Sequence, residues 1–135
     1  MRAFIDACHL VYLNTVTDSQ NKNQYWQLYE DILSSYRIVT NVLVLDETIY
    51  ISMKKYGVPY DVTIDFIDEI ITPYTDILPL GLYEYRIAKD AILQYGFRPS
   101  DALHFGTMQN HDVTAIVTED SDFDIVEGID IIWLS

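Results

Sequence analysis

The sequence predicts an α/β domain in which helices cover both faces of a parallel sheet, a three-layer arrangement. Three observations lead to this fold class. Short apolar segments alternate along the chain with longer segments whose apolar residues recur at helical spacing. The length of 135 residues suits one domain of ordinary size. No repeat, low-complexity tract or linker interrupts the chain, so we place no boundary within residues 1–135.

The first part of the chain predicts two strands separated by two helices. Residues 2–5 are apolar and end at Asp6, which is typical of a short buried strand. Residues 7–13 are compatible with a helix, and residues 22–36 carry an amphipathic helical stripe. Residues 37–40 then favour a second short strand. The stripe consists of Tyr25, Trp26, Tyr29, Ile32, Leu33 and Tyr36.

The middle of the chain predicts two more helices and a strand. Residues 42–56 indicate a long helix, which Gly57 can end in a left-handed conformation. Residues 61–71 repeat the helical stripe and stop before Pro73, because proline disfavours helical geometry in the residue before it. Residues 76–79 favour a brief third strand.

The last part of the chain predicts two helices and two strands. Residues 83–95 repeat an apolar position every fourth residue, and Gly96 follows as a helix stop. Residues 99–109 form a helix that begins with proline, at the position where a missing N–H costs least. Residues 114–118 are β-branched and apolar, which favours a central strand, and residues 129–133 favour the final one.

The chain is strongly acidic, with 21 Asp and Glu against 8 Lys and Arg and a formal net charge of −13. No basic residue follows Arg98, although eight acidic residues do. Because non-specific nucleic-acid binding depends on Lys and Arg, this distribution argues against a basic nucleic-acid-binding module. The acidic residues either keep the protein soluble or, in part, converge on a cation.

The cysteine content and the hydropathy of the chain predict its cellular compartment. The single cysteine, Cys8, excludes a disulfide framework and a cysteine-rich zinc site, and it suits a reducing environment. No segment approaches the roughly 18 apolar residues of a membrane span. Only three apolar residues separate Arg2 from Asp6, so no secretory signal is expected. We therefore expect a cytoplasmic protein without a membrane partner.

Several carboxylates occupy positions where a parallel sheet binds ligands. Asp6 follows the first predicted strand and Asp120 the fourth, and ligands bind beyond the carboxyl ends of such strands. Glu47 lies within an apolar helix, and Asp101 in the first turn of another. Each also has an ordinary alternative. Asp6 can cap a helix, and Asp101 can complement a helix dipole. Glu47 can face solvent, and Asp120 can be a turn residue, as can Asp122.

The combination of these carboxylates is more specific than any one of them. Four or five carboxylates that meet at one place cannot all ionise without a cation. Hard ions such as Mg²⁺ and Mn²⁺ select oxygen ligands and can bridge to phosphate oxygens despite acidic surroundings. The sequence is therefore compatible with metal-assisted phosphodiester chemistry.

Four segments carry a resemblance to a known family. In this order, over Arg2 to Trp133, they look like the four motifs of the PIN-domain nucleases, and most of all like those of VapC-type ribonuclease toxins. The third and fourth segments are the most specific. The four segments are Phe4-Ile5-Asp6, Leu45-Asp46-Glu47-Thr48, Arg98-Pro99-Ser100-Asp101-Ala102-Leu103-His104 and Val117-Thr118-Glu119-Asp120-Ser121-Asp122-Phe123-Asp124.

The resemblance implies a fold, an activity and a set of site residues. The family fold is a five-stranded parallel sheet in the order 3-2-1-4-5 with helices on both faces. The implied activity is Mg²⁺- or Mn²⁺-dependent endoribonuclease cleavage, in which a metal-activated water attacks the phosphorus. Carried over by motif, the catalytic and metal-binding acids are Asp6, Glu47, Asp101 and Asp120, with Asp122 as a fifth metal ligand.

Other positions bear on the substrate. Thr118 matches the family's polar residue beside the site, and we assign it to substrate binding. Arg98 either contacts a phosphate or is an ordinary surface charge. Family members often carry Ser or Thr and then Asn directly after the first Asp, whereas Ala7 and Cys8 stand there in this chain. This departure bears on turnover rather than on fold.

The resemblance also implies partners. We expect an RNA substrate, a homodimer and a small antitoxin protein, from which an Arg can pair with the acidic cluster. The alternative is a catalytically weak PIN domain that acts as an RNA- or protein-binding module. A DNA-directed nuclease is a third possibility that the residues leave open.

Other interpretations are weaker. The acids from Asp120 onward lack the Gly and Glu of a calcium-binding EF-hand loop. Cys8 is interpreted as a buried structural thiol rather than a nucleophile. His104 fits the helical pattern, and a site of oxygen ligands has no need of it. The aromatic stripe around Tyr25 and Trp26 is interpreted as core or as an oligomer face.

Overall fold

A five-stranded parallel sheet forms the centre of the computed structural model, which describes all residues 1–135. The strand order is β3-β2-β1-β4-β5, which confirms the order implied by the family resemblance. Every neighbouring pair of strands is parallel. The strands are β1 (Arg2–Ile5), β2 (Arg37–Thr40), β3 (Thr75–Ile77), β4 (Ala115–Val117) and β5 (Asp130–Ile132).

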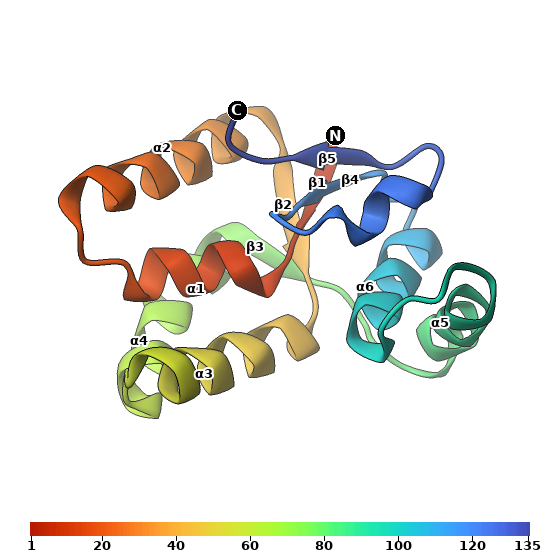
Figure 1. Cartoon of the computed structure of the whole chain (residues 1–135), viewed down its shortest axis with the longest axis horizontal. Helices are drawn as coiled ribbons and strands as arrows, with labels where there is room; N and C mark the ends of the chain where they lie inside the picture. The colour runs from red at the N-terminus through yellow and green to blue at the C-terminus, as the bar shows by residue number, and fades with distance from the viewer.

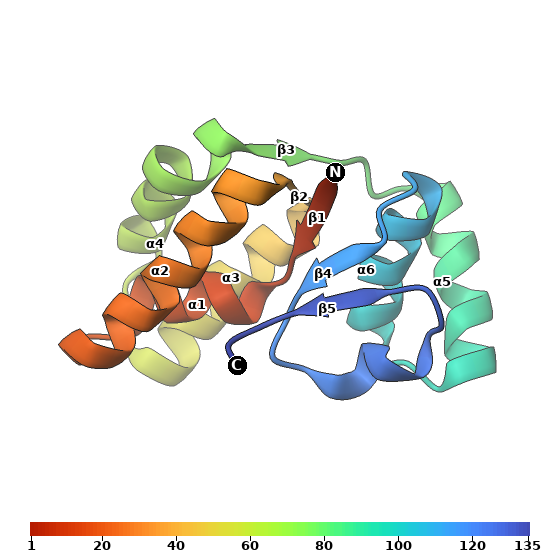
Figure 2. The same ribbon diagram turned by 90° about the horizontal axis from the view of Figure 1, so that it is seen from above.

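Helices cover both faces of the sheet, as the alternation of segments predicts. Figures 1 and 2 show α1 to α4 on one side and α5 and α6 on the other. None of these helices combines the length and the apolar character needed to cross a bilayer. The helices are α1 (Ala7–Thr15), α2 (Ser19–Ser35), α3 (Val42–Tyr56), α4 (Tyr60–Phe66), α5 (Leu82–Tyr95) and α6 (Pro99–Asn110).

The two central strands, β1 and β4, place their carboxyl ends side by side. In their register Phe4 lies opposite Ile116, and Ile5 lies opposite Val117. The ladder continues one residue further, because the N–H of Asp6 donates to the carbonyl of Val117 over 3.2 Å. The strand order reverses between β1 and β4, so the residues that follow them lie at the switch point of the sheet.

Helix α3 has the bounds that the sequence predicts, and its two ends show why. The Asn41 side chain accepts a hydrogen bond from the N–H of Val44 over 3.0 Å, which satisfies a backbone donor at the start of the helix. Gly57 ends the helix with φ of 70°, a left-handed conformation that a residue without Cβ adopts at no steric cost. Glu47 is therefore held on a well-defined helix.

Several predicted boundaries are corrected by the structure. Helix α2 begins at Ser19 rather than Lys22, because the Asp18 side chain accepts from the N–H of Asn21. The helix predicted over residues 61–71 consists of α4 and a π-helical turn, Ile67–Ile71.

The third strand is also displaced from its predicted range. A 3₁₀ turn over Thr72–Tyr74 leads into β3, which spans Thr75–Ile77 instead of residues 76–79. The last ladder bond runs from the N–H of Leu78 to the carbonyl of Thr40. Pro79 has no N–H to continue the pairing, so the strand ends before it.

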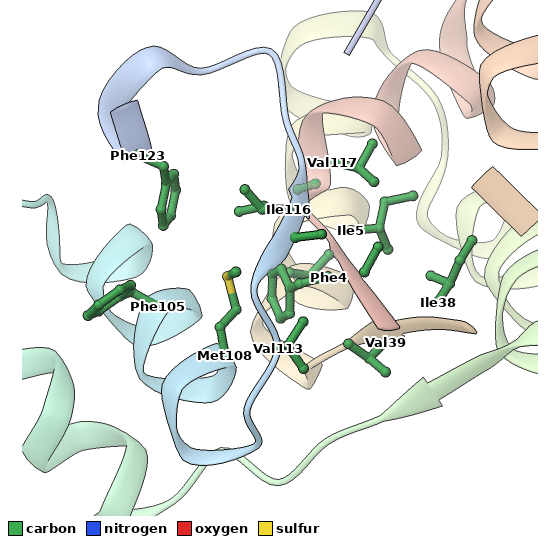
Figure 3. Close-up of a cluster of buried hydrophobic side chains, with 14 of the residues drawn as sticks. Phe4, Ile5, Ile38, Val39, Phe105, Met108, Val113, Ile116, Val117 and Phe123 are labelled. Atoms are coloured by element: carbon green, nitrogen blue, oxygen red, sulfur yellow. The ribbon is translucent and has the colours of Figure 1, made fainter. Parts of the chain in front are cut away.

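The core lies on both faces of the central strands. Figure 3 shows Phe4 and Ile116 on the strands, with Met108 and Phe105 of α6 packed on the same side. Phe4, Ile116 and Met108 are fully buried. Burial of apolar surface contributes a free energy on the order of 25 cal/mol per Å² removed from water. This burial is therefore the main stabilising term for the sheet and its helices. The packing fixes the position of α6 against the sheet.

Helices α5 and α6 approach each other unusually closely at Gly106. A Cβ atom at this position would lie 2.3 Å from the carbonyl oxygen of Glu84 on α5. The buried Glu84 side chain in turn accepts a hydrogen bond from the N–H of Gly81 over 2.6 Å and contacts Asn110 of α6. This contact matters for the site, because α6 carries Asp101 and His104.

Candidate active site

A cleft of about 400 Å³ opens at the carboxyl ends of the central strands. Four of the predicted acids line it, and each comes from a different part of the fold. Asp6 follows β1, Glu47 lies on α3, Asp101 lies on α6 and Asp120 follows β4. Asp122 lies beside the cleft rather than in its lining. Residues far apart in the sequence therefore line one cleft.

Asp6 is held by both of its carboxylate oxygens. Oδ1 accepts from the backbone N–H of Cys8 over 2.6 Å and so caps α1, as the ordinary interpretation of this residue expects. Oδ2 accepts from the Thr118 hydroxyl over 2.7 Å. The capping interaction and the location in the cleft thus occur together in one side chain.

Thr118 connects the acids at the ends of the two strands. Its Oγ1 donates to Asp6 and accepts from the backbone N–H of Asp120 over 3.0 Å. The Asp120 carboxylate accepts in turn from the N–H of Asp122 over 3.0 Å and begins a 3₁₀ turn, Ser121–Ile125. Thr118 is fully buried, so the structure places it beneath Asp6 rather than at a surface that faces substrate.

Three carboxylates gather around the guanidinium of Arg98. Its Nη2 lies 3.0 Å from Asp120 Oδ2, 3.3 Å from Asp101 Oδ2 and 3.4 Å from Asp122 Oδ2. Oxygen atoms of the three acids all lie within 4.8 Å of one another. The Arg98 guanidinium thus occupies the position in which a small metal cation would be bound by the same three carboxylates. The Arg98 side chain itself is 71% exposed.

Asp101 is the most buried of these three acids. Burial, the largest cause, raises the pKa of Asp101 from 3.8 to about 6; the nearby Arg98 opposes this rise, and Asp120 adds to it. The buried Oδ2 atom accepts no hydrogen bond within the protein, and its charged neighbour is Arg98 Nη2 at 3.3 Å. A buried carboxylate oxygen without a donor is costly unless a cation reaches it.

These observations test whether a divalent metal fits the cleft. The available ligands are carboxylate oxygens, which Mg²⁺ and Mn²⁺ prefer. Three of them are close enough to share one ion, and Asp101 Oδ2 lacks any other hydrogen-bond partner. The residues present therefore fit a hard divalent cation.

Glu47 lines the cleft and contacts His104, a residue that the sequence did not place in the site. The Nε2 atom of His104 lies 2.7 Å from Glu47 Oε1, which ties α6 to α3. Asp101 and His104 are three residues apart on α6, and residues at this spacing share one face of a helix. That spacing is the signal from which His104 follows as a neighbour of the site.

Cys8 lines the cleft but is not a favourable nucleophile. Burial, followed by the charge of Asp6, raises the pKa of the Cys8 thiol far above its ordinary value. Its sulfur accepts from the N–H of Glu119 over 3.4 Å and lies 4.0 Å from the Thr118 hydroxyl. These contacts agree with the interpretation of Cys8 as a structural thiol.

One wall of the cleft is aromatic. The Tyr12 hydroxyl donates to Glu119 over 2.6 Å, and its ring stacks on Tyr25 with centroids 4.6 Å apart. Tyr25 and Trp26 pack, partly buried, against the core, which confirms the core interpretation of this stripe. Lys55 lines the same cleft and is the lining cation other than Arg98.

The fold and these clustered acids define a class of protein, and comparison with known families agrees. The PIN domain family matches residues 3–129, so the chain belongs to the PIN-domain family. The predicted likeness to VapC-type proteins is confirmed by ribonuclease VapC13 of Mycobacterium tuberculosis. The two sequences are 33% identical over 110 residues, which is 76% of this chain and 79% of that protein.

Solved structures agree on the fold. The VapC20 toxin of Mycobacterium tuberculosis, described as cleaving the sarcin–ricin loop, has a TM-score of 0.75 at 14% identity, covering 95% of this chain and 97% of its own. VapBC2 of Rickettsia felis, solved with a DNA fragment from its promoter, has a TM-score of 0.69 at 16% identity, covering 97% of each chain. At these identities the similarity establishes the shared fold.

Proposed function

We propose that this protein is a metal-dependent endoribonuclease and the toxin of a VapBC-type pair. One observation carries the proposal: Asp6, Glu47, Asp101 and Asp120 come from separate elements and line the same cleft. Membership of the PIN-domain family and the similarity to a VapC ribonuclease support a hydrolytic nuclease. The net charge of −13 argues that charge neutralisation by a cation precedes contact with RNA.

The ligands of the cation are the carboxylates already described. One ion could be held by carboxylate oxygens of Asp101, Asp120 and Asp122, which lie close together. The cleft beside them is lined by Asp6 and Glu47. Mg²⁺ or Mn²⁺, when bound, would supply Lewis-acid activation of water and neutralisation of charge on the phosphate. The protein contributes by holding its acidic groups in fixed positions before the substrate arrives.

Two further residues receive distinct roles. The buried Thr118 positions Asp6 and Asp120 through its two hydrogen bonds. Arg98 must leave the acidic cluster when a cation enters it, and its exposed guanidinium is then available to a phosphate of the RNA. Its ion pairs with the carboxylates and its proposed contact with substrate are thus alternatives.

The proposed partners follow from the same family. Solved structures with the same fold include a toxin–antitoxin complex from Klebsiella pneumoniae, which supports a small antitoxin as partner of this chain. An Arg from such a partner would replace Arg98 among the three carboxylates. We also propose a homodimer in the cytoplasm. Exposed apolar side chains at the start of α5, namely Leu82, Tyr83 and Tyr85, support a further interface, and sedimentation would test it.

Cleavage of structured RNAs in the presence of Mn²⁺ tests the function. We expect the wild type to cut, and Asp6→Asn and Asp101→Asn to lose at least about 100-fold, because each removes a charged ligand. Asp124→Asn is a matched control, since Asp124 is exposed and does not line the cleft. Equal cleavage by all variants, or none with any metal, would contradict the proposal and favour a binding module.

A further inference from the structure

Glu47 is the one acid of the cleft whose side chain is held by another side chain from the opposite layer. It lies on α3, whereas its partner His104 lies on α6, and the two atoms Oε1 and Nε2 are 2.7 Å apart. The His104 ring is almost completely buried and packs against Phe4, with ring centroids 5.4 Å apart. A ring confined in this way has little freedom to rotate.

The other ring nitrogen of His104 determines which nitrogen carries the proton. Asn41 caps α3 with its Oδ1 atom, which accepts from the N–H of Val44. This cap fixes the orientation of the amide, so its NH₂ group faces His104, with Nδ2 3.2 Å from Nδ1. Because an amide nitrogen can only donate, Nδ1 must accept, and the proton therefore resides on Nε2.

The second amide proton of Asn41 is also used. It is donated to the Thr107 hydroxyl over 2.9 Å, and that hydroxyl donates to the carbonyl of Leu103 over 3.1 Å. Asn41 and Thr107 are fully buried, so every donor in this chain of hydrogen bonds has a partner away from water. A fully satisfied buried network of this kind is rigid.

We propose that His104 is a positioning residue for metal binding: its Nε2–H, directed by Asn41, holds Glu47 Oε1 and leaves Oε2 to face the cation. This inference rests on the proposed function, since it assigns a role toward the same metal. Glu47 is 24% exposed, and without His104 its side chain would be free to turn toward solvent. Hydrogen-bond partners of metal ligands typically contribute 10- to 100-fold to affinity or activity.

Calorimetric titration with Mn²⁺ tests the positioning role. We expect His104→Phe, which keeps an aromatic ring but removes the donor, to weaken Mn²⁺ binding by about 10- to 100-fold. His104→Gln retains an N–H donor and should recover most of the affinity. His111→Gln, at the end of the same helix and outside the cleft, should bind as the wild type does. In a Glu47→Gln background, His104→Phe should cause no further loss.

The possible results separate this inference from the proposed function. If the wild type binds Mn²⁺ and His104→Phe binds it equally, the positioning role is overturned while the nuclease proposal stands. If the wild type binds no Mn²⁺, both fail. Since His104 is buried, His104→Phe must first be shown to be folded by circular dichroism.

A second measurement needs no substitution in the core. In the wild-type protein labelled with ¹⁵N at histidine, two-dimensional NMR reports which ring nitrogen of His104 is protonated. We expect the Nε2–H tautomer. A proton on Nδ1 would break the hydrogen bond from Asn41 and would overturn the inference, whatever the behaviour of the variants.

Discussion

The Thr118 hydroxyl donates a hydrogen bond to Asp6 Oδ2 over 2.7 Å, although the two residues are 112 positions apart in the chain. Thr118 follows β4 and Asp6 follows β1, and the carboxyl ends of these two neighbouring strands lie side by side in the sheet. The same oxygen of Thr118 receives the N–H of Asp120. One buried hydroxyl therefore sets the spacing between two proposed metal ligands.

We predict that Thr118→Val weakens Mn²⁺ binding and cleavage by about 10-fold or more, because it removes the donor to Asp6 while preserving shape. Loss of a buried hydrogen bond should also lower stability by about 1–3 kcal/mol. Thr118→Ser keeps the hydroxyl and should restore most of the affinity. Calorimetry and thermal unfolding measure the two effects. A Thr118→Val protein with unchanged Mn²⁺ affinity would refute the positioning role of this hydroxyl.

Replacement of Arg98 should have opposite effects on metal and on RNA. In Arg98→Gln the cation no longer competes with a guanidinium among three carboxylates, so Mn²⁺ should bind more tightly, by roughly three- to tenfold after allowance for the exposure of Arg98. Cleavage should nevertheless decline through a higher KM for RNA. Arg86→Gln, an exposed arginine on α5, controls for net charge. Weaker Mn²⁺ binding by Arg98→Gln would be inconsistent with competition.

In the metal-free protein, the contribution of Asp101 to stability should decline as pH rises from 5 to 7. The folded state raises the pKa of Asp101 from 3.8 to about 6, mainly through burial. In this interval the folded state binds more protons than the unfolded state, so the contribution of Asp101 to stability is greatest below its unfolded pKa and declines as pH rises through about 6.

Asp101→Asn removes this titration and provides the comparison. In the presence of EDTA, the Tm of the variant relative to that of the wild type should rise by a few degrees between pH 5 and pH 7. Addition of Mn²⁺ at pH 7 should then stabilise the wild type and not the variant, because binding to the folded state alone raises stability. A difference in Tm that is constant with pH would exclude this role of Asp101.

Gly106 should not tolerate a larger side chain. Alanine has a helix propensity about 1 kcal/mol more favourable than glycine, but the added Cβ would meet the Glu84 backbone oxygen at 2.3 Å. Because the backbone oxygen cannot rotate away as the end of a side chain can, the overpacking cost of about 1–3 kcal/mol or more should exceed the gain in helix propensity. Gly106→Ala is therefore expected to lower Tm, whereas Gln109→Ala, at an exposed position of the same helix, should change it little.

Much of the fold follows from local patterns in the sequence. Helix α3 has its predicted bounds because Asn41 and Gly57 act on the backbone within a few residues of themselves. The start of β3 was misplaced because its limits depend on pairing with β2, a contact between distant segments. The strand order came from the family resemblance and is confirmed, since periodicity alone does not specify which strands are neighbours.

The site residues divide in the same way, into those that follow from the sequence pattern and those that depend on contacts between distant segments. The acids at strand ends were found because the topology of a parallel sheet brings such positions together. The spacing of His104 from Asp101 indicates only that His104 lies near the site; its contact with Glu47 joins two layers and does not follow from the pattern of either helix. The environment of Arg98 was missed for a related reason: its partners Asp120 and Asp122 lie beyond a whole strand.

The separate origins of the four acids also determine when the protein can begin to act. A nascent chain that has not yet added β4 lacks both the fourth acid, Asp120, and the Thr118 hydroxyl that orients the first. No early fragment holds a complete set of ligands. For a protein that would attack RNA in the cell that makes it, this arrangement postpones the hazard until β4 and Asp120 have been synthesised.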